Sequence, residues 1–360
     1  MKRNFLILYI LFSVLILWGQ EPAGYYNAAN GKKGRALRVA LSQIISQNFH
    51  SVGYSGLWNA FPQTDGKVWD IYSDLPGGTP PYEFTFGDDK CGSYSKEGDC
   101  YNREHSIPAS WFDDQNPMYS DLFHIYPTDG FVNNKRGNLP FGEVNSPSWT
   151  SKNGSKLGPC ATAGCSGNAF EPIDEYKGDL ARSYFYMCTR YMNKNFGQVG
   201  NSMFNGSDLD PWALSMLIRW HQNDPVSQKE IDRNNNIYSI QHNRNPFIDH
   251  PDLVGKIFGA DSINAFVYGS AIQEFINNDC AVYPNPANTE IHIQLNYFSA
   301  KEYCIYDSYG KIALRQNYDD FSNENSITCH VQDLPSGVYI LKLVDNQQNI
   351  IIKKIIIQHQ

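Results

Sequence analysis

Two short segments of the chain carry the residue types needed to hydrolyse a phosphodiester. Glu104 and His105 are neighbours, and Asn133 follows about one supersecondary unit later. A carboxylate and an amide oxygen can hold a hard divalent cation, and an imidazole beside them can take a proton from water near neutral pH. The spacing therefore favours a site that combines a metal ion with a general base.

The pair Glu104-His105 carries little weight by itself, because an acid next to a histidine also occurs by chance on surface loops. Its neighbours make it more informative. Arg103 supplies a cation that could meet a phosphate, and Pro108 ends the extended stretch soon after His105. We therefore expect His105 to be held near the end of a strand.

A zinc site is the competing interpretation of the same region. It would combine His105 with Asp121 and His124, but the chain has no H-E-x-x-H and no paired C-x-x-C from which to build a closed shell. We interpret His124 as a structural residue that orients the site through a hydrogen bond rather than as a ligand.

The elements that must position these residues follow from hydrophobic periodicity and turn signals. Apolar residues at helical spacing predict one helix within residues 22–50 and further helices at 179–193, 211–222 and 227–240. Residues 51–103 carry turn signals between short β-type runs such as 68–72.

The composition changes after about residue 278. Short strand-like runs alternate with turn clusters at hairpin spacing, at 290–295, 303–306, 338–344 and 350–357. This pattern predicts a small all-β sandwich without a helix. The fold class expected for the whole chain is α+β, with a mainly helical first domain.

The chain of 360 residues suggests two domains behind a leader. Lys2 and Arg3 precede an apolar run over 5–18 that only Ser13 interrupts. The run is shorter than the roughly 20 residues that cross a bilayer, so residues 1–20 are expected to be a secretory signal peptide. Domains are then expected at 21–278 and 279–360, with no stable membrane span.

Eight cysteines in an exported chain predict disulfide bonds. Two close pairs lie in loops rich in Gly, Ser and Asp, and a third pair could form across strands of the tail. These pairs are Cys91 with Cys100, Cys160 with Cys165, and Cys304 with Cys329. Cys188 is interpreted as a buried thiol, and Cys280 has no evident partner.

The net charge of −8 is unusual for a protein that binds a polyanion. Summed charge governs solubility and long-range steering, whereas binding needs only a local positive patch. The charge disfavours a tight, sequence-specific DNA binder. It leaves room for an enzyme that holds its substrate through one metal ion and a few arginines.

The order of the motifs is more specific than any one of them. R-E-H-x-x-P from Arg103, followed by D-x-x-H-x-x-P-x-D-G-x-V-N-x-x-R-G-N from Asp121, resembles the bacterial endonuclease I family of secreted or periplasmic nucleases. The resemblance continues through 181–187 and 241–251 and covers roughly residues 25–255. It implies a ββα-metal (His-Me finger) core in the first domain.

The resemblance also implies roles by motif position. Glu104 matches the acidic metal ligand, His105 the general base and Asn133 the amide ligand. The implied cofactor is Mg²⁺, for which Mn²⁺ or Ca²⁺ could substitute. We expect supporting roles for Asp121, His124 and Asn138.

The chain departs from the family pattern at one point. Family members typically carry an arginine between the histidine and the asparagine motif, where it supports the phosphate, but no Arg or Lys lies between His105 and Asn133. The role could pass to Arg136, Arg182 or Arg103, or to a backbone donor. We assign Arg136 to the catalytic phosphate contact and expect Arg103 and Arg182 to bind substrate.

The tail contains V-Y-P-N-P-A from residue 282, I-Y-D-S-Y-G-K from residue 305, L-P-S-G-V-Y-I from residue 334 and K-K-I from residue 353. This series resembles the C-terminal sorting domain of the type IX (Por) secretion system of Bacteroidetes-type bacteria. A generic adhesion or sugar-binding sandwich is the alternative. The resemblance implies the type IX machinery as a partner, passage across the outer membrane, and release or surface attachment.

The leading hypothesis is thus a secreted or cell-surface, metal-dependent, non-specific endonuclease. Its expected substrate is DNA and, by extension, RNA, and we expect it to act as a monomer. The alternative is a catalytically impaired, nuclease-like surface binding protein, which the missing arginine and the acidic charge favour. A zinc metalloprotease lacks its motif.

Overall fold

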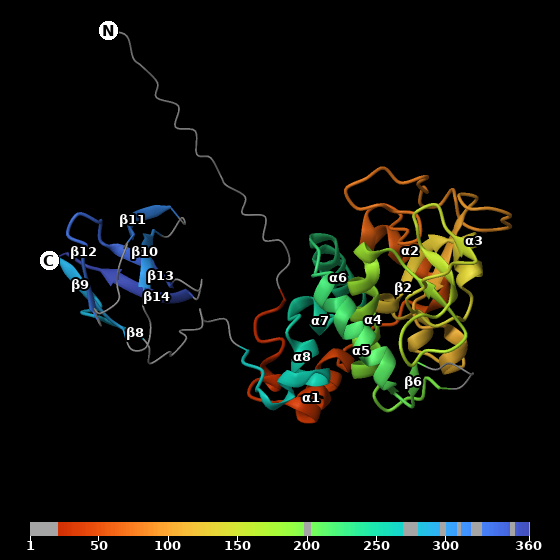
Figure 1. Cartoon of the computed structure of the whole chain (residues 1–360), viewed down its shortest axis with the longest axis horizontal. Helices are drawn as coiled ribbons and strands as arrows, with labels where there is room; N and C mark the ends of the chain where they lie inside the picture. Colours follow the sequence, from red (N-terminus) through yellow and green to blue (C-terminus); the bar gives the residue numbers. More distant parts are fainter. Residues whose placement is uncertain are drawn as a thin grey trace, which may run out of the picture. The chain divides into compact units, whose positions relative to one another are not determined.

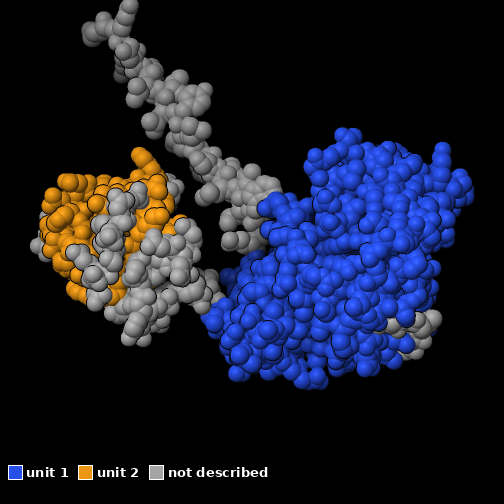
Figure 2. All heavy atoms as spheres, in the orientation of Figure 1, with its two compact units in different colours: residues 1–268 blue, residues 269–360 orange. Residues whose placement is uncertain are grey.

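The computed structural model describes residues 21–197, 203–268, 280–295, 300–307, 311–317, 326–345 and 350–359. The expected signal peptide, residues 1–20, lies outside them. The chain divides into two compact units, residues 1–268 and 269–360 (Figure 2), and each has its own hydrophobic core. The first is called the nuclease-like unit below, after its resemblance, and the second the tail.

Helices form most of the regular structure in the nuclease-like unit (Figure 1). They are α1 (Gly34–Ser46), α2 (Gly53–Asp65), α3 (Gly130–Arg136), α4 (Lys177–Arg190), α5 (Pro211–Asn223), α6 (Gln228–Gln241), α7 (Pro246–Asp249) and α8 (Leu253–Phe258). Helix α4 packs against α1, α5 and α7, and nearly all of its residues are buried. It is therefore the central helix of this unit.

A ββα unit follows α2 in the chain. Strand β1 (Tyr101–His105) pairs antiparallel with β2 (Ile125–Asp129), so that Glu104 stands opposite Tyr126, and α3 follows β2 directly. Asp129 caps α3, because its Oδ1 accepts a hydrogen bond from the backbone N–H of Val132 at 2.8 Å. This arrangement confirms the α+β class with its ββα core.

Residues 51–103 differ from the expectation of short strands. Helix α2 occupies Gly53–Asp65, and its buried residues Leu57, Ala60, Phe61 and Thr64 follow the helical repeat. Residues 68–72 form no strand. A turn forms there instead, because Oδ1 of Asp70 accepts the backbone N–H of Tyr72 at 2.9 Å.

Two small antiparallel sheets complete the described nuclease-like unit. One contains β3 (Trp149–Thr150), β4 (Lys156–Pro159) and β5 (Asn168–Glu171), and the other pairs β6 (Phe204–Asn205) with β7 (Asp208–Leu209). The expected disulfides Cys91–Cys100 and Cys160–Cys165 are both formed. The first packs against Gly130, since a Cβ added there would lie 2.4 Å from Sγ of Cys91.

The described part of the tail is all-β, as expected. One sheet has the order β11-β10-β13-β14 and the other β12-β9-β8. The strands are β8 (Cys280–Tyr283), β9 (Glu290–Leu295), β10 (Ala300–Tyr306), β11 (Ile312–Asn317), β12 (Ser326–His330), β13 (Gly337–Asp345) and β14 (Ile350–Ile357). Alternating residues of the strands, such as Ile291, Ile293 and Leu295, are buried in one core.

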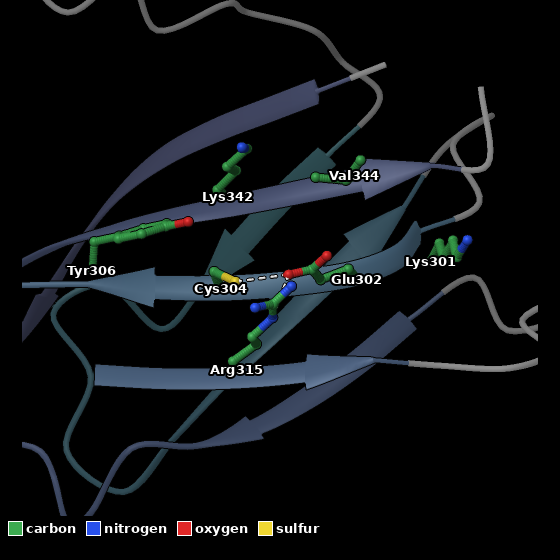
Figure 3. A pocket seen from close by; sticks show the side chains of 7 residues that line it. All are labelled: Lys301, Glu302, Cys304, Tyr306, Arg315, Lys342 and Val344. Atoms are coloured by element: carbon green, nitrogen blue, oxygen red, sulfur yellow. Dashed lines mark hydrogen bonds and ion pairs between the residues drawn. The ribbon is translucent and has the colours of Figure 1, made fainter. Parts of the chain in front are cut away.

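The expected pairing of Cys304 with Cys329 is wrong. The two residues belong to different sheets and are both free thiols. Cys304 stands in register with Arg315 and Lys342 and lines a hollow of about 270 Å³ together with charged side chains (Figure 3), whereas Cys329 belongs to the tail's core. The tail's core contains Tyr303 and Ile305 but not Cys304, because side chains alternate between the two faces of a strand. Cys304 therefore faces away from the core in which Cys329 lies.

Among the residues that the structure describes, no helix is both long enough and apolar enough to cross a membrane.

Candidate active site

Alternation along β1 divides the expected site residues between its two faces. Asn102 and Glu104 contact side chains of α3, whereas Arg103 and His105 contact rings from α2 and from the segment around Tyr119. The strand thus presents a carboxylate on one face and an imidazole on the other. Because the two residues are consecutive, both lie at the same end of the strand.

Glu104 is buried, with 3% of its surface exposed. Its Oε1 accepts hydrogen bonds from the Tyr72 hydroxyl at 2.6 Å and from Nη1 of Arg136 at 2.9 Å. Burial raises the pKa of Glu104 above its ordinary value, and Arg136 and Tyr72 oppose that rise. Its Oε2 accepts no hydrogen bond within the described part of the chain.

Asn133 lies on α3 and is partly exposed. Its Nδ2 donates to Oδ1 of Asn102 at 2.7 Å, which fixes the orientation of the amide. The Oδ1 atom of Asn133 accepts no hydrogen bond from any described residue. The orientation of the amide therefore leaves this oxygen available to a ligand.

His105 is enclosed by aromatic groups and is 8% exposed. Its ring is nearly parallel to that of Tyr119, with centroids 5.2 Å apart, and lies 5.8 Å from that of Tyr54. Nε2 lies 3.3 Å from the carbonyl oxygen of Tyr119. A carbonyl only accepts, so the contact assigns the proton to Nε2 and leaves a lone pair on Nδ1.

The electrostatic surroundings keep this imidazole neutral. Burial, followed by the charges of His124, Arg103 and Arg136, lowers the pKa of His105 to about 3. A neutral ring with a free nitrogen lone pair is the form that can accept a proton.

Residues 33–252 match the family described as Endonuclease I. An extracellular ribonuclease of Bacillus amyloliquefaciens is 35% identical over 259 residues, which cover 68% of this chain and 82% of that protein. The chain belongs to the endonuclease I family. It is therefore an endonuclease, an enzyme that hydrolyses phosphodiester bonds, and members of this family generally depend on a divalent metal.

Other relatives carry related names. An extracellular ribonuclease of Bacillus subtilis (strain 168) is 33% identical over 65% of this chain and 78% of its own length. An extracellular deoxyribonuclease of Aeromonas hydrophila is 27% identical over 38% of this chain and 52% of its own length. Residues 281–358 match the secretion system C-terminal sorting domain, so this endonuclease is secreted or held at the cell surface.

Arg136 and Arg182 of the endonuclease are buried among acceptors. Arg136 is 1% exposed and donates to Glu104 and to the carbonyls of His105 and Ser106. Arg182 is 0% exposed and binds both carboxylate oxygens of Glu230. Arg136 thus pairs with the carboxylate of Glu104, and Arg182 of α4 pairs with the carboxylate of Glu230 on α6.

The three residues expected to support the endonuclease site have different surroundings. Asp121 is buried and accepts hydrogen bonds from Tyr186, Arg190, Tyr191 and Gln241, which fasten its segment to α4 and α6. His124 donates from Nε2 to the carbonyl of Met118 at 2.7 Å, and its ring centroid lies 5.4 Å from that of His105. Asn138 is exposed.

Several residues of the site were not expected from the sequence. Asn102 could have been found, because it lies two residues before Glu104 and so shares its face of β1. Tyr72 had no local signal, since its contact with Glu104 joins positions 32 residues apart. Tyr54 was missed because α2 itself was not predicted.

Proposed function

We propose that this endonuclease is metal-dependent and non-specific and cleaves DNA and RNA, with Glu104 and Asn133 holding one Mg²⁺ ion and His105 acting as general base. The observation that carries the proposal is the pair of available oxygens, Oε2 of Glu104 and Oδ1 of Asn133. Neither accepts a hydrogen bond among the described residues, and both side chains are held in place by neighbours.

The donor set suits a hard cation. Mg²⁺ prefers oxygen ligands, keeps several waters and is commonly held by one or two carboxylates together with substrate phosphates. The described residues contain no group of three or more His, Cys, Asp and Glu side chains that could hold a metal, which disfavours a closed zinc shell. When bound, the ion would neutralise charge on a phosphate oxygen and on the leaving 3′ oxygen.

His105 supplies the proton acceptor in this proposal. Its Nδ1 takes a proton from a water molecule as the oxygen of that water attacks phosphorus and the bond to the 3′ oxygen breaks. Glu104 and His105 leave opposite faces of β1 at the same end of the strand, and we expect a phosphodiester that lies across this end to contact both.

The surroundings of the arginines favour Arg103 for the phosphate contact. Arg136 and Arg182 are already neutralised by buried carboxylates. Arg103 forms no ion pair among the described residues, and its Nη1 donates only to the carbonyl of Tyr54 at 3.0 Å. A phosphate oxygen would be its first anionic partner.

The test is digestion of plasmid DNA and of structured RNA by the mature protein with Mg²⁺ and with EDTA. We expect cleavage of both substrates with Mg²⁺ and none with EDTA. His105→Ala should lower the rate by a factor of at least about 10², whereas the exposed residue His50 should tolerate replacement by Ala. A wild-type protein that binds nucleic acid without cleaving it would instead establish the catalytically impaired binding protein.

A further inference from the structure

A strip of cations and aromatic rings lies on the His105 face of β1. The guanidinium carbon of Arg103 lies 3.6 Å from the ring centroid of Tyr54 and 4.5 Å from that of Trp58. Tyr54 and Trp58 are one turn apart on α2 and so share one face of it. Nζ of Lys90 lies 5.7 Å from the Trp58 ring centroid.

The strip carries positive charge that pairs with no carboxylate among the described residues. Eight arginines of the described residues pair with a carboxylate, namely Arg38, Arg136, Arg182, Arg190, Arg219, Arg233, Arg244 and Arg315. Arg103 and Lys90 have no such partner there. Stacking on two rings holds the Arg103 guanidinium in one orientation without an acid.

The strip is continuous with the expected general base. Arg103 and His105 are alternate residues on the same face of β1. The Tyr54 ring, which stacks with that of Tyr119 at 4.2 Å between centroids, lies 5.8 Å from the ring of His105. Tyr54, Trp58 and Tyr119 are each partly exposed, and Lys90 is exposed. A ligand on the strip would therefore reach the reacting phosphate.

We propose that Arg103, Tyr54, Trp58 and Lys90 form a subsite for an unpaired nucleotide next to the scissile phosphate, which directs the enzyme towards single-stranded nucleic acid. This inference rests on the proposed function. Arg103 binds the phosphate, and the base stacks on the indole of Trp58 as the flexible Lys90 side chain moves to the neighbouring phosphate. A paired base in a duplex has both faces covered by its neighbours, whereas an unpaired base offers a face to an aromatic ring.

The test compares Trp58→Leu with wild type on four ligands of equal length: single-stranded DNA, single-stranded RNA, duplex DNA and a single strand of abasic sites. Kd is measured in EDTA by fluorescence anisotropy for all four ligands. KM and kcat are measured with Mg²⁺ on the three ligands that contain bases. We expect Trp58→Leu to weaken binding of both base-containing single strands about tenfold, with duplex and abasic Kd within about twofold. KM should rise in parallel, with kcat little changed.

Two further variants separate stacking from packing. Trp58→Phe keeps a ring and should recover most of the single-strand affinity, and Trp212→Leu, at a partly exposed tryptophan on α5, should have no effect. An equal loss on all four ligands, or no loss on any, would overturn the subsite. A larger effect on RNA than on DNA would identify RNA as its preferred strand.

The same measurements separate the two proposals. If wild type binds single strands in EDTA through Trp58 but cleaves nothing with Mg²⁺, the proposed function fails and the subsite stands. If wild type cleaves single and duplex strands and Trp58→Leu retains the wild-type KM and Kd on both, the subsite fails and the proposed function stands.

Discussion

At the residue scale, neighbours in space decide which oxygens of the site remain available. Asn102 orients Asn133 by accepting from Nδ2, and Tyr72 and Arg136 together occupy one oxygen of Glu104. Glu104 and Asn133 are the metal ligands that we propose, and partners that orient metal ligands commonly matter nearly as much as the ligands themselves. Asn102 is therefore the residue whose loss should affect the metal without removing a ligand.

We predict that Asn102→Ala weakens Mn²⁺ or Mg²⁺ binding by about 10- to 100-fold, because the amide of Asn133 then rotates freely. Isothermal titration with Mn²⁺ measures this effect without any substrate. Asn223, an exposed residue of α5, provides the matched control when it is replaced by Ala. Unchanged Mn²⁺ affinity in Asn102→Ala would remove Asn133 from the proposed ligand set.

At the scale of elements, the start of α3 is fixed from two sides. The backbone N–H of Gly130 donates to the carbonyl of Cys100 at 2.9 Å, and the Cys91–Cys100 disulfide lies against the α carbon of Gly130. Asp129 caps the helix and also accepts from the N–H of Gly98 at 2.7 Å. The helix that carries Asn133 thus depends on a loop 30 residues earlier in the chain.

We predict that Gly130→Ala displaces α3 and lowers the free energy of unfolding by about 1–3 kcal/mol, because the new methyl group overlaps Sγ of Cys91. Metal affinity should fall with it, since Asn133 moves. Thermal unfolding and Mn²⁺ titration measure the two effects. Gly92→Ala, at a position with open space around the added Cβ, is the control, and equal melting temperatures for both variants would contradict the packing argument.

At the scale of the whole molecule, the unfolding of the nuclease-like unit can be measured separately from that of the tail. All seven tryptophans precede residue 269, so tryptophan fluorescence reports unfolding of the nuclease-like unit alone. This unit contains a buried carboxyl group, that of Asp70, whose pKa is raised above its ordinary value. Burial, the largest influence, raises the pKa of Asp70 to about 7, although Ser73 and the N–H of Tyr72 oppose the rise.

We predict that Asp70 makes the nuclease unit less stable as pH rises. Its pKa in the folded state lies above the ordinary value of 3.8, so its contribution is fully present below about pH 4 and is lost as pH rises to about 7. Asp70→Asn should keep the acceptor oxygen and, compared with wild type, raise the free energy of unfolding at pH 8 relative to that at pH 4 by roughly 4 kcal/mol. Urea unfolding of both proteins at pH 4 and at pH 8 measures this difference in the free energy of unfolding.

The exposed residue Asp88, replaced by Asn, is the control for the pH prediction. Its variant should show the same difference between pH 4 and pH 8 as wild type. An Asp70→Asn variant with the wild-type difference would mean that the Asp70 carboxyl stays ionised in its buried position.

The sequence by itself determined much of the architecture. Helical periodicity predicted α4, α5 and α6 to within a few residues, because this repeat follows from local backbone geometry. Strand-like runs between turn clusters predicted β9, β10, β13 and β14 of the tail. The close cysteine pairs were also predictable, since short loops keep their ends together. Helix α2 escaped prediction although Leu57, Ala60, Phe61 and Thr64 repeat correctly, because glycines and a proline surround them.

Only the tertiary structure decided which arginines near the candidate site pair with a carboxylate and which one does not. The sequence does not distinguish Arg136 and Arg182 from Arg103. Folding buries Arg136 against Glu104 and Arg182 against Glu230. Arg103 instead stacks on a ring of α2 and pairs with no carboxylate among the described residues. Glu104 and His105 are adjacent in sequence, yet their side chains leave opposite faces of β1. Which partners each of them meets depends on contacts between residues far apart in the chain, and local propensity does not encode those contacts.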